Sequence, residues 1–413
     1  MKNITIIGGG IIGLSCAYYL VRDGHAVTVI DRNNEHEGSS NQNAGMIVPS
    51  HIIPLASPGM ISKGIQWMFN SQSPFYVKPR LSGDLVRWGI KFYQSANEQH
   101  VRKSIPVLRD LSLISRQLFN DINTEIGNSF LFSERGLMML YKTKSTEHEE
   151  IEAAKLANEA GVRAEILSQS DVQKFETDFQ VDVLGGVYYP GDAHLNPSLL
   201  MQNLKKYLLE KNVNIISGEE VKSLETKNGN VFSVITSNGR IPTDAVVIAT
   251  GAWSPELTRL LGLNLLLQGG KGYSFTLSDM TKNIQIPSIL LERRVAVTPM
   301  GNQLRIGGTM EIGGIDLTIH KNRVKGIVDS MQKYYPEMDV RFPEKIWRGL
   351  RPCSPDGLPY IGKMKSYENA FAATGHGMMG LSLGPVTGKL ISEMIGNKKT
   401  EIETEPFSPN RFD

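Results

Sequence analysis

The sequence predicts an α/β fold in which a domain with a parallel sheet is interleaved with an α+β domain built on an antiparallel sheet. The first observation is a strand, a glycine-rich turn, a helix and a second strand, all within residues 1–32. The second is the return of the same strand-and-glycine pattern at residues 246–253 and 371–380. The third is that the two intervening stretches are rich in short strands separated by turn signals. A parallel sheet assembled from separated segments, with insertions that carry a second sheet, accounts for all three.

The opening unit has every part of a dinucleotide-binding motif. Ile4–Ile7 is a β-branched run bounded by glycines, which predicts a short buried parallel strand. Gly8–Gly13 carries the G-x-G-x-x-G spacing, and a helix is expected over Leu14–Asp23. A second strand over Ala26–Ile30 ends at Asp31. This complete arrangement of strand, turn, helix, strand and acid predicts a Rossmann-like unit that binds a dinucleotide.

Each residue type in this unit suits that ligand. Gly8 permits the tight turn, Gly10 lets the backbone approach a pyrophosphate, and Gly13 brings the helix close to the strand. The free N–H groups at the start of the helix attract the negative charge of the phosphates. Asp31 is placed to accept hydrogen bonds from the hydroxyls of the adenosine ribose.

Three later loops predict which dinucleotide is bound. Residues 38–45 form a small polar loop, residues 246–253 a buried strand that opens into a glycine turn, and residues 374–380 a glycine-dense loop before a helix. Three separated loops of this kind suit a large cofactor that is buried along its length, which predicts FAD. The residues expected to hold it are Gly8, Gly10, Ile11, Ile12, Gly13, Asp31, Arg32, Ser39, Ser40, Asn43, Ala44, Gly45, Val221, Thr250, Gly251, Trp253, Gly375, Gly377, Met378, Met379 and Gly380.

Composition limits the possible partners. Lys and Arg total 44 against 42 Asp and Glu, so the chain has no basic excess suited to nucleic acid. Its two cysteines, Cys16 and Cys353, are too few for a disulfide framework and lack metal-binding spacing. The N-terminal apolar run is interrupted by the glycine turn, unlike a signal peptide. No stretch reaches the roughly 18 apolar residues that would span a membrane. We therefore expect a cytoplasmic protein without a metal.

The other elements follow in chain order. Pro49, Pro54 and Pro58 predict an extended strip without regular structure. Amphipathic periodicity predicts helices over 62–70, 81–97, 104–126, 146–161, 197–211, 321–335 and 381–395. A strand pair is expected over 130–132 and 136–141, and a hairpin around Asn238-Gly239 over 231–237 and 240–242. Further strands or extended segments are expected over 185–190, 213–217, 273–277, 288–292, 295–299, 303–307, 346–352 and 371–373.

This order makes both domains discontinuous. We assign residues 1–60, 195–262 and 345–413 to the FAD-binding domain and its C-terminal tail, and residues 61–194 and 263–344 to the substrate domain. Such insertions can place a sheet over the reactive ring of the cofactor, at the crevice where ligands of open α/β sheets bind.

With these motifs in place, the chain resembles the FAD-dependent amine and D-amino-acid oxidoreductases, most closely the bacterial D-amino-acid dehydrogenases. The group also includes glycine and sarcosine oxidases and cyclic D-imino-acid dehydrogenases. The resemblance runs nearly end to end. It rests on residues 24–31, 43–45, 49–58, 271–273, 305–308, 310–313, 349–352, 355–357 and 375–377, together with Lys63, Trp67, Met68 and Phe69.

The resemblance implies oxidative deamination of a D-amino acid by hydride transfer from Cα to the flavin, giving a 2-oxo acid and ammonia. It places Arg351 where related enzymes bind the substrate carboxylate, a task for which the guanidinium fork is suited. Tyr273 is expected to bond the same carboxylate, to cap the pocket or to lie in the core. His376, between two glycines, is expected to order the loop beside the flavin pyrimidine ring. Arg305 and Arg348 are expected to be structural, with Arg305 the next candidate for the carboxylate.

Two departures leave alternatives for the substrate. The loop over residues 377–385 lacks the tryptophan of the closest dehydrogenases and looks more like the glycine-oxidase and hydroxyproline-dehydrogenase branches. Cys353 does not occupy the flavin-attachment position of sarcosine oxidases, so the FAD is expected to be non-covalent. The alternatives are a D-proline or cis-4-hydroxy-D-proline dehydrogenase that produces a cyclic imine, an oxygen-using glycine or sarcosine oxidase, and a dinucleotide-binding module without turnover.

The expected electron acceptor is a quinone or another electron-transfer partner. Trp67, Met68 and Phe69 place large apolar side chains on a short helix flanked by prolines. Such side chains can rest on a lipid interface, although a core-facing helix has the same pattern. The sequence therefore leaves open a peripheral contact with the inner face of the membrane.

Overall fold

The computed structural model describes residues 1–34, 38–68, 72–80 and 82–413. Its parallel sheet has the strand order β19-β20-β13-β1-β2-β9, in which only β19 is antiparallel to its neighbour. The strands span Asn3–Ile7 (β1), Ala26–Asp31 (β2), Asn214–Ser217 (β9), Ala245–Ile248 (β13), Tyr360–Lys363 (β19) and Ala370–Thr374 (β20). Because the strand order reverses at β1, ligands of such a sheet bind at the carboxyl ends of β1 and its neighbours.

Both faces of this sheet are buried, which is why its strands are almost wholly apolar. One face packs against α1 (Ile11–Arg22), α4 (Glu98–Glu125), α7 (Pro197–Glu210) and α10 (Gly384–Ile395). The other face packs against α8 (Ser254–Leu260) and a small antiparallel sheet of β10 (Val221–Lys227), β11 (Asn230–Thr236) and β12 (Arg240–Pro242). The parallel-sheet domain therefore has three layers.

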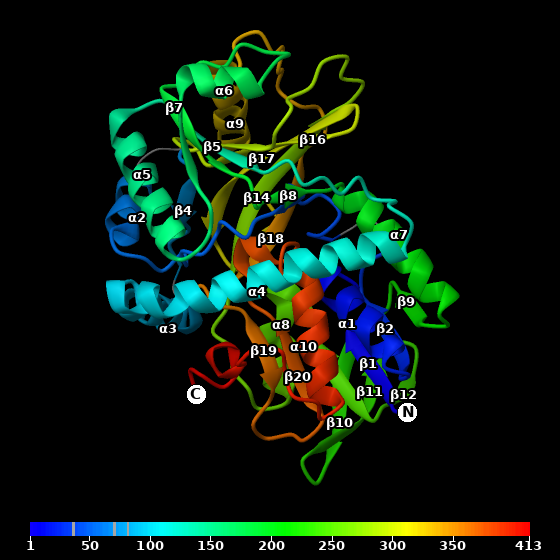
Figure 1. Ribbon diagram of the computed structural model, residues 1–413. Helices are drawn as coiled ribbons and strands as arrows, with labels where there is room; N and C mark the ends of the chain where they lie inside the picture. The colour runs from blue at the N-terminus through cyan, green and yellow to red at the C-terminus, as the bar shows by residue number, and fades with distance from the viewer. Residues whose placement is uncertain (35–37, 69–71, 81) are drawn as a thin grey trace.

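The long helix α4 connects the two domains. It runs across the middle of the molecule, between the parallel sheet and the second sheet (Figure 1). Leu108, Leu111, Phe119 and Ile122 of α4 share the core of α1 and α10. A helix from the range that the sequence assigned to the substrate domain thus completes the core of the parallel-sheet domain.

Within the described residues, the second sheet has nine strands, in the order β18-β14-β17-β16-β15-β5-β7-β6 with β4 beside β17. The pairs β15–β5 and β17–β4 are parallel and the others are antiparallel. The strands span Phe75–Val77 (β4), Leu137–Tyr141 (β5), Glu165–Ser168 (β6), Gly185–Tyr189 (β7), Gln268–Leu277 (β14), Ser288–Leu290 (β15), Val295–Met300 (β16), Gln303–Ile312 (β17) and Trp347–Cys353 (β18).

Short elements surround this sheet (Figure 1). The helices are α2 (Met60–Met68), α3 (Gly83–Ser95), α5 (Lys144–Glu159), α6 (Gln169–Phe175) and α9 (Lys321–Tyr334). A two-stranded ladder joins β3 (Met46–Ile47) to β8 (Ala193–His194). The 3₁₀ turns η1 (Gly251–Trp253) and η2 (Gly377–Met379) contact β18, whereas η3 (Glu405–Phe407) contacts β19 of the parallel sheet.

Most expected elements are present, with several corrections. Residues 130–132 form no strand, and β5 pairs with β7 and β15 instead. The helix that was expected from residue 104 begins at Glu98, where Asn97 caps it by accepting a hydrogen bond from the His100 backbone N–H at 2.9 Å. The segment at 49–58 contains no helix or strand, as its prolines predict. Phe69 lies outside the described residues.

Candidate active site

A cavity of about 930 Å³ opens between the two sheets. Its walls include the carboxyl ends of β1 and β2, the loop at 38–44, the proline strip, the turn after β13, the last strand of the second sheet and the loop at 376–381. These segments are far apart in sequence. The cavity is thus built at the crevice that the strand order predicts.

The glycine turn shapes one end of this cavity. Gly8 has a φ of +113°, and a Cβ there would lie 2.4 Å from the Ala249 carbonyl oxygen. Gly13 faces away from the cavity, and a Cβ on it would lie 1.8 Å from the Gly8 carbonyl oxygen. A side chain at either position would displace the backbone, so the turn requires glycine at both.

Asp31 and Ser40 hold the turn from two sides. The Gly9 backbone N–H donates to Asp31 Oδ2 at 2.6 Å, and the Asn33 N–H donates to Oδ1 at 2.8 Å. The Ser40 Oγ accepts from the Ile11 N–H at 2.9 Å, at the start of α1. Side chains that line the cavity thus fix the first turn of the helix.

The later loops meet this turn. Arg32 stacks over the indole ring of Trp253, with its guanidinium carbon 4.3 Å from the ring centroid. The Thr374 hydroxyl donates to the Gly251 carbonyl oxygen at 2.9 Å, which ties the second loop to the third. Most of the residues expected to hold the cofactor line the cavity. Three of them, Gly13, Gly45 and Gly375, are not part of its lining.

The arrangement fits a dinucleotide. The glycine turn forms a cradle that a Cβ would fill, and the buried Nδ1 atom of His376 has no hydrogen-bond partner within the described residues. The His376 Nε2 atom lies 2.9 Å from the Thr387 hydroxyl, and burial lowers the pKa of the ring to about 3. His376 is therefore neutral, and its contact with Thr387 joins this loop to α10.

Arg351 lies on the cavity wall in β18. Its Nη1 donates to the Thr309 carbonyl oxygen at 2.8 Å, and no carboxylate in the described ranges forms an ion pair with it. Burial lowers the pKa of the guanidinium. A Cβ on Gly272, in the neighbouring strand β14, would lie 2.1 Å from Arg351 Nη1. Because Gly272 has no side chain, the Arg351 guanidinium can occupy the space next to it.

Arg305 and Arg348 do not share this environment. Arg305 is buried off the cavity wall and donates to the Thr276 hydroxyl at 2.7 Å and to the Asn43 carbonyl oxygen at 3.1 Å. Arg348 is exposed and donates to the Leu317 carbonyl oxygen at 2.9 Å. Neither residue is part of the cavity wall, and Arg305 bonds to the loop that carries Asn43.

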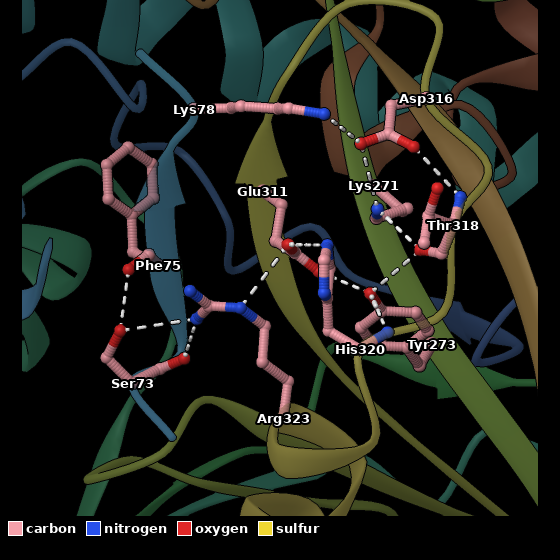
Figure 2. Close-up of polar contacts among 10 residues, drawn as sticks. All are labelled: Ser73, Phe75, Lys78, Lys271, Tyr273, Glu311, Asp316, Thr318, His320 and Arg323. Atoms are coloured by element: carbon pink, nitrogen blue, oxygen red, sulfur yellow. Dashed lines mark hydrogen bonds and ion pairs between the residues drawn. The ribbon is translucent and has the colours of Figure 1, made fainter. Parts of the chain in front are cut away.

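The hydroxyl of Tyr273 is directed away from Arg351, contrary to a role in carboxylate binding. Side chains alternate along β14, so Tyr273 faces the opposite side of the sheet from Gly272. Its hydroxyl donates to the buried Glu311 and accepts from the His320 backbone N–H at 3.1 Å. Figure 2 shows this ring among Glu311, Thr318 and His320, with Arg323 on the other side of Glu311. Tyr273 is thus part of a buried polar network.

The cavity also contains residues that the sequence did not single out. His51 and Ser50 lie on its wall in the proline strip, and it is also lined by Glu150 of α5, Tyr189 of β7 and Arg294 in the turn between β15 and β16. The signal for His51 was a titratable side chain between Pro49 and Pro54, where helix and strand are excluded. Glu150, Tyr189 and Arg294 carried no comparable signal.

Comparisons with known proteins agree with this architecture. The DAO family, described as FAD dependent oxidoreductase, matches residues 3–394. The D-amino acid dehydrogenase of Granulibacter bethesdensis is 30% identical over 417 residues, covering 99% of each chain. The D-amino acid dehydrogenase of Helicobacter pylori is 29% identical, covering 95% of this chain and 94% of the relative.

Solved structures share the fold. Glycine oxidase from Geobacillus kaustophilus superposes with a TM-score of 0.80 at 23% identity, covering 99% of this chain and 98% of that one. L-proline dehydrogenase from P. horikoshii superposes with a TM-score of 0.76 at 20% identity, covering 100% and 97%. With the family match over almost the whole chain, this protein belongs to the DAO family of FAD-dependent oxidoreductases.

Proposed function

We propose that this chain oxidises D-amino acids to 2-oxo acids and ammonia and passes the electrons to a quinone-type acceptor. Relatives that are 29–30% identical over nearly the whole chain are named D-amino acid dehydrogenases. The observation that carries the proposal is Arg351, a guanidinium on the cavity wall without a carboxylate partner in the described ranges. A substrate carboxylate would supply that partner.

The chain's own residues would bind and orient the substrate. Bound FAD supplies the two-electron acceptor. Arg351 offers a planar fork of N–H donors whose direction is fixed by its bond to the Thr309 carbonyl oxygen, so the carboxylate can bind in only a few orientations. The apolar residues around the remaining space exclude water and leave a substrate side chain in dry surroundings: Ile52, Met139, Ile289, Leu291, Met310 and Trp347.

Anaerobic bleaching of the flavin tests the proposal. The holoenzyme is mixed without oxygen with D-amino acids, their L-enantiomers, glycine, sarcosine and cyclic imino acids, and flavin absorbance is followed. Bleaching by D-amino acids, with release of ammonia, is the expected result. Bleaching by D-proline or cis-4-hydroxy-D-proline alone would instead indicate a cyclic imine product. Bleaching by glycine, sarcosine or L-amino acids alone would contradict the proposal, and so would a flavin that no amino acid reduces.

The FAD is expected to be bound without a covalent link. Cys16 and Cys353 are buried and do not line the cavity, and burial raises the pKa of each thiol to about 12. Neither sulfur is a thiolate that could attack the flavin ring. Acid precipitation should therefore release all the yellow colour into the supernatant. Colour retained in the pellet would contradict this expectation.

Contact with a membrane surface is part of the proposed route to a quinone. Trp67 packs near Phe75, with their ring centroids 6.4 Å apart, and lines the cavity, so it is not a free surface aromatic. Helix α3 presents the exposed apolar face instead: Val86, Ile90 and Tyr93 are 59%, 52% and 73% exposed. Arg87 and Lys91 lie beside them, a pattern suited to anionic lipid.

We expect the substitution Ile90→Asp to weaken sedimentation with anionic vesicles. Removing one buried apolar side chain from the interface, and adding a negative charge, should lower binding on the order of 10-fold. Leu209→Asp on α7, where the leucine is 57% exposed, is the matched control and should bind as the unaltered enzyme does. Equal binding by all three proteins would exclude α3 as the contact.

The acceptor is tested by reoxidation. Flavin reduced by substrate is mixed with a soluble quinone analogue or with oxygen, and the return of absorbance is timed. Faster reoxidation by the quinone is expected for a dehydrogenase. Oxygen that keeps pace with the quinone would identify an oxidase.

A further inference from the structure

Three polar residues, two of them adjacent in the sequence and the third far along the chain, form a continuous path from the cavity into the protein. Ser50 and His51 lie on the cavity wall, and Asp192, just before β8, is fully buried. The Ser50 hydroxyl donates to Asp192 Oδ2 at 2.5 Å, and the Ser50 backbone N–H donates to Oδ1 at 3.0 Å. On its other side, the Ser50 hydroxyl lies 3.1 Å from His51 Nδ1. The path thus runs from His51 through Ser50 to Asp192.

The hydrogen-bond directions determine which atom of His51 faces the cavity as an acceptor. Because Ser50 gives its single hydroxyl proton to Asp192, its oxygen can only accept from His51. The His51 proton is then on Nδ1, and Nε2 carries a lone pair. Nε2 has no hydrogen-bond partner in the described ranges and is not among the side-chain atoms sealed from solvent, so it is open to the cavity.

We propose that His51, Ser50 and Asp192 form a proton relay that accepts a proton from the ammonium group of the substrate. The inference rests on the proposed function, because it names how that reaction would obtain a neutral amine. An amino acid in water carries an ammonium group, whereas oxidation at Cα requires the nitrogen lone pair. Arg351 binds the carboxylate and leaves this proton to another residue.

The transfer balances in protons and charge. One N–H bond of the ammonium breaks and its proton bonds to His51 Nε2. The Nδ1 proton of His51 passes to the Ser50 oxygen, and the Ser50 proton passes to Asp192 Oδ2. The substrate becomes a neutral amine, His51 remains neutral in its other tautomer, and the Asp192 carboxylate becomes a carboxylic acid. One positive and one negative charge disappear from a region with little water, so the step avoids leaving either charge unpaired.

The surroundings of the relay set the protonation states from which it starts. Burial, and after it the positive charge of Arg294, lowers the pKa of His51 to about 4, so the ring starts neutral. Burial raises the pKa of Asp192 to about 7, against the opposing effects of its hydrogen bonds from Ser50 and of the positive charge of Arg116. Tyr188 and Tyr189 also lie near Asp192, and Glu150 bonds to the Tyr189 hydroxyl at 3.4 Å. Asp192 must begin ionised, so the relay gains capacity as the pH rises through about 7.

The rate of anaerobic flavin reduction at saturating substrate, measured against pH, tests the relay. His51→Gln keeps a polar group on the cavity wall but cannot take a proton. Near neutral pH its reduction rate should fall on the order of 10²–10⁴-fold, the usual contribution of a general base. The loss should shrink as the pH approaches the pKa of the substrate ammonium, because neutral amine then binds directly from solution.

The variant Asp192→Asn distinguishes a loss of proton transfer from a change in the shape of the cavity wall. The amide oxygen still accepts from the Ser50 backbone N–H, but the amide nitrogen can only donate to the Ser50 hydroxyl and takes no proton. This variant should show the same alkaline recovery and should lose the inflection near pH 7 that the unaltered enzyme is expected to have. His25→Gln, at an exposed backbone contact with Lys2 away from the cavity, is the matched control and should follow the unaltered profile. Bound FAD per chain is measured for each variant to confirm that the fold is kept.

The two proposals fail in different ways. An unaltered enzyme whose flavin no amino acid bleaches contradicts the proposed function and the relay together. The relay alone is overturned if the unaltered enzyme is active and His51→Gln matches it near neutral pH. A loss of the same fold at neutral and alkaline pH, with full FAD content, also overturns it, because that pattern indicates a role in shape rather than in proton transfer.

Discussion

The substitution Arg351→Ala is expected to lower kcat/KM by on the order of 30- to several-thousand-fold while FAD stays bound. A substrate carboxylate that enters this cavity loses water, and removing its charged partner typically costs about 2–5 kcal/mol. The Arg351 guanidinium donates to the Thr309 carbonyl oxygen, and among the described residues it makes no hydrogen bond to the glycine turn or to Asp31. The loss should therefore appear in steady-state kinetics with an unchanged flavin spectrum.

The companion variant Arg351→Lys tests geometry separately from charge. Lysine keeps the positive charge but has no planar fork, so it should bind substrate weakly and align Cα poorly. Arg348→Ala is the matched control, since Arg348 is three positions away in the same strand and exposed. Near-normal kcat/KM in Arg351→Ala would place the carboxylate elsewhere. Arg305 is already engaged by Thr276 and Asn43, so Arg294, on the cavity wall, would then be the residue to replace.

The parallel-sheet domain could be predicted because its signals are local. The strand at Ile4–Ile7, the spacing Gly8–Gly13 and the strand that ends at Asp31 lie within one short unit, and each part constrains the next. The separate glycine loops at 250–253 and 374–380 were then expected to bind the same cofactor, and therefore to line one cavity with the first turn. The structure places both loops beside the first turn.

The substrate side was harder to predict because it depends on strand register. The pairing of β14 with β17 shifts register between Lys271 and Tyr273. Thr309 lies at this irregularity with a φ of +66°, and its carbonyl oxygen accepts the hydrogen bond from Arg351. No local pattern specifies that bulge. The same register directs Tyr273 to the opposite side of the sheet, where Glu311 engages its hydroxyl. A motif-based expectation for Tyr273 could not detect this.

The relay residues illustrate the same limit across longer distances. Ser50 and Asp192 are separated by 142 positions, and their hydrogen bond forms only because the proline strip passes close to the segment before β8. The sequence shows that His51 lies in a proline-rich strip, but it does not show that Asp192 completes the path through Ser50. Pairs of this kind are specified by tertiary packing rather than by spacing.

The second large effect is expected from Gly13→Ala, which should abolish or strongly weaken FAD binding. A methyl group on residue 13 would lie 1.8 Å from the Gly8 carbonyl oxygen, inside any allowed contact, and also 3.3 Å from the Ile6 side chain. Either α1 moves away from β1 or the turn opens, and both displace the N–H groups that face the pyrophosphate. Forcing an extra methyl into a packed site costs about 1–3 kcal/mol, which corresponds to FAD binding about 5- to 150-fold weaker if the cost falls on the bound state.

Gly89→Ala provides the contrast, because a Cβ on this α3 residue would meet no atom within 4 Å. It should bind FAD normally and gain about 0.5–1 kcal/mol of stability, since alanine is the better helix former. FAD per chain after gel filtration, and the dissociation constant from flavin fluorescence, distinguish the two variants. Gly13→Ala protein that retains full FAD with an unchanged dissociation constant would show that the turn tolerates a shift of α1, and that the close contact of α1 with β1 does not position the pyrophosphate.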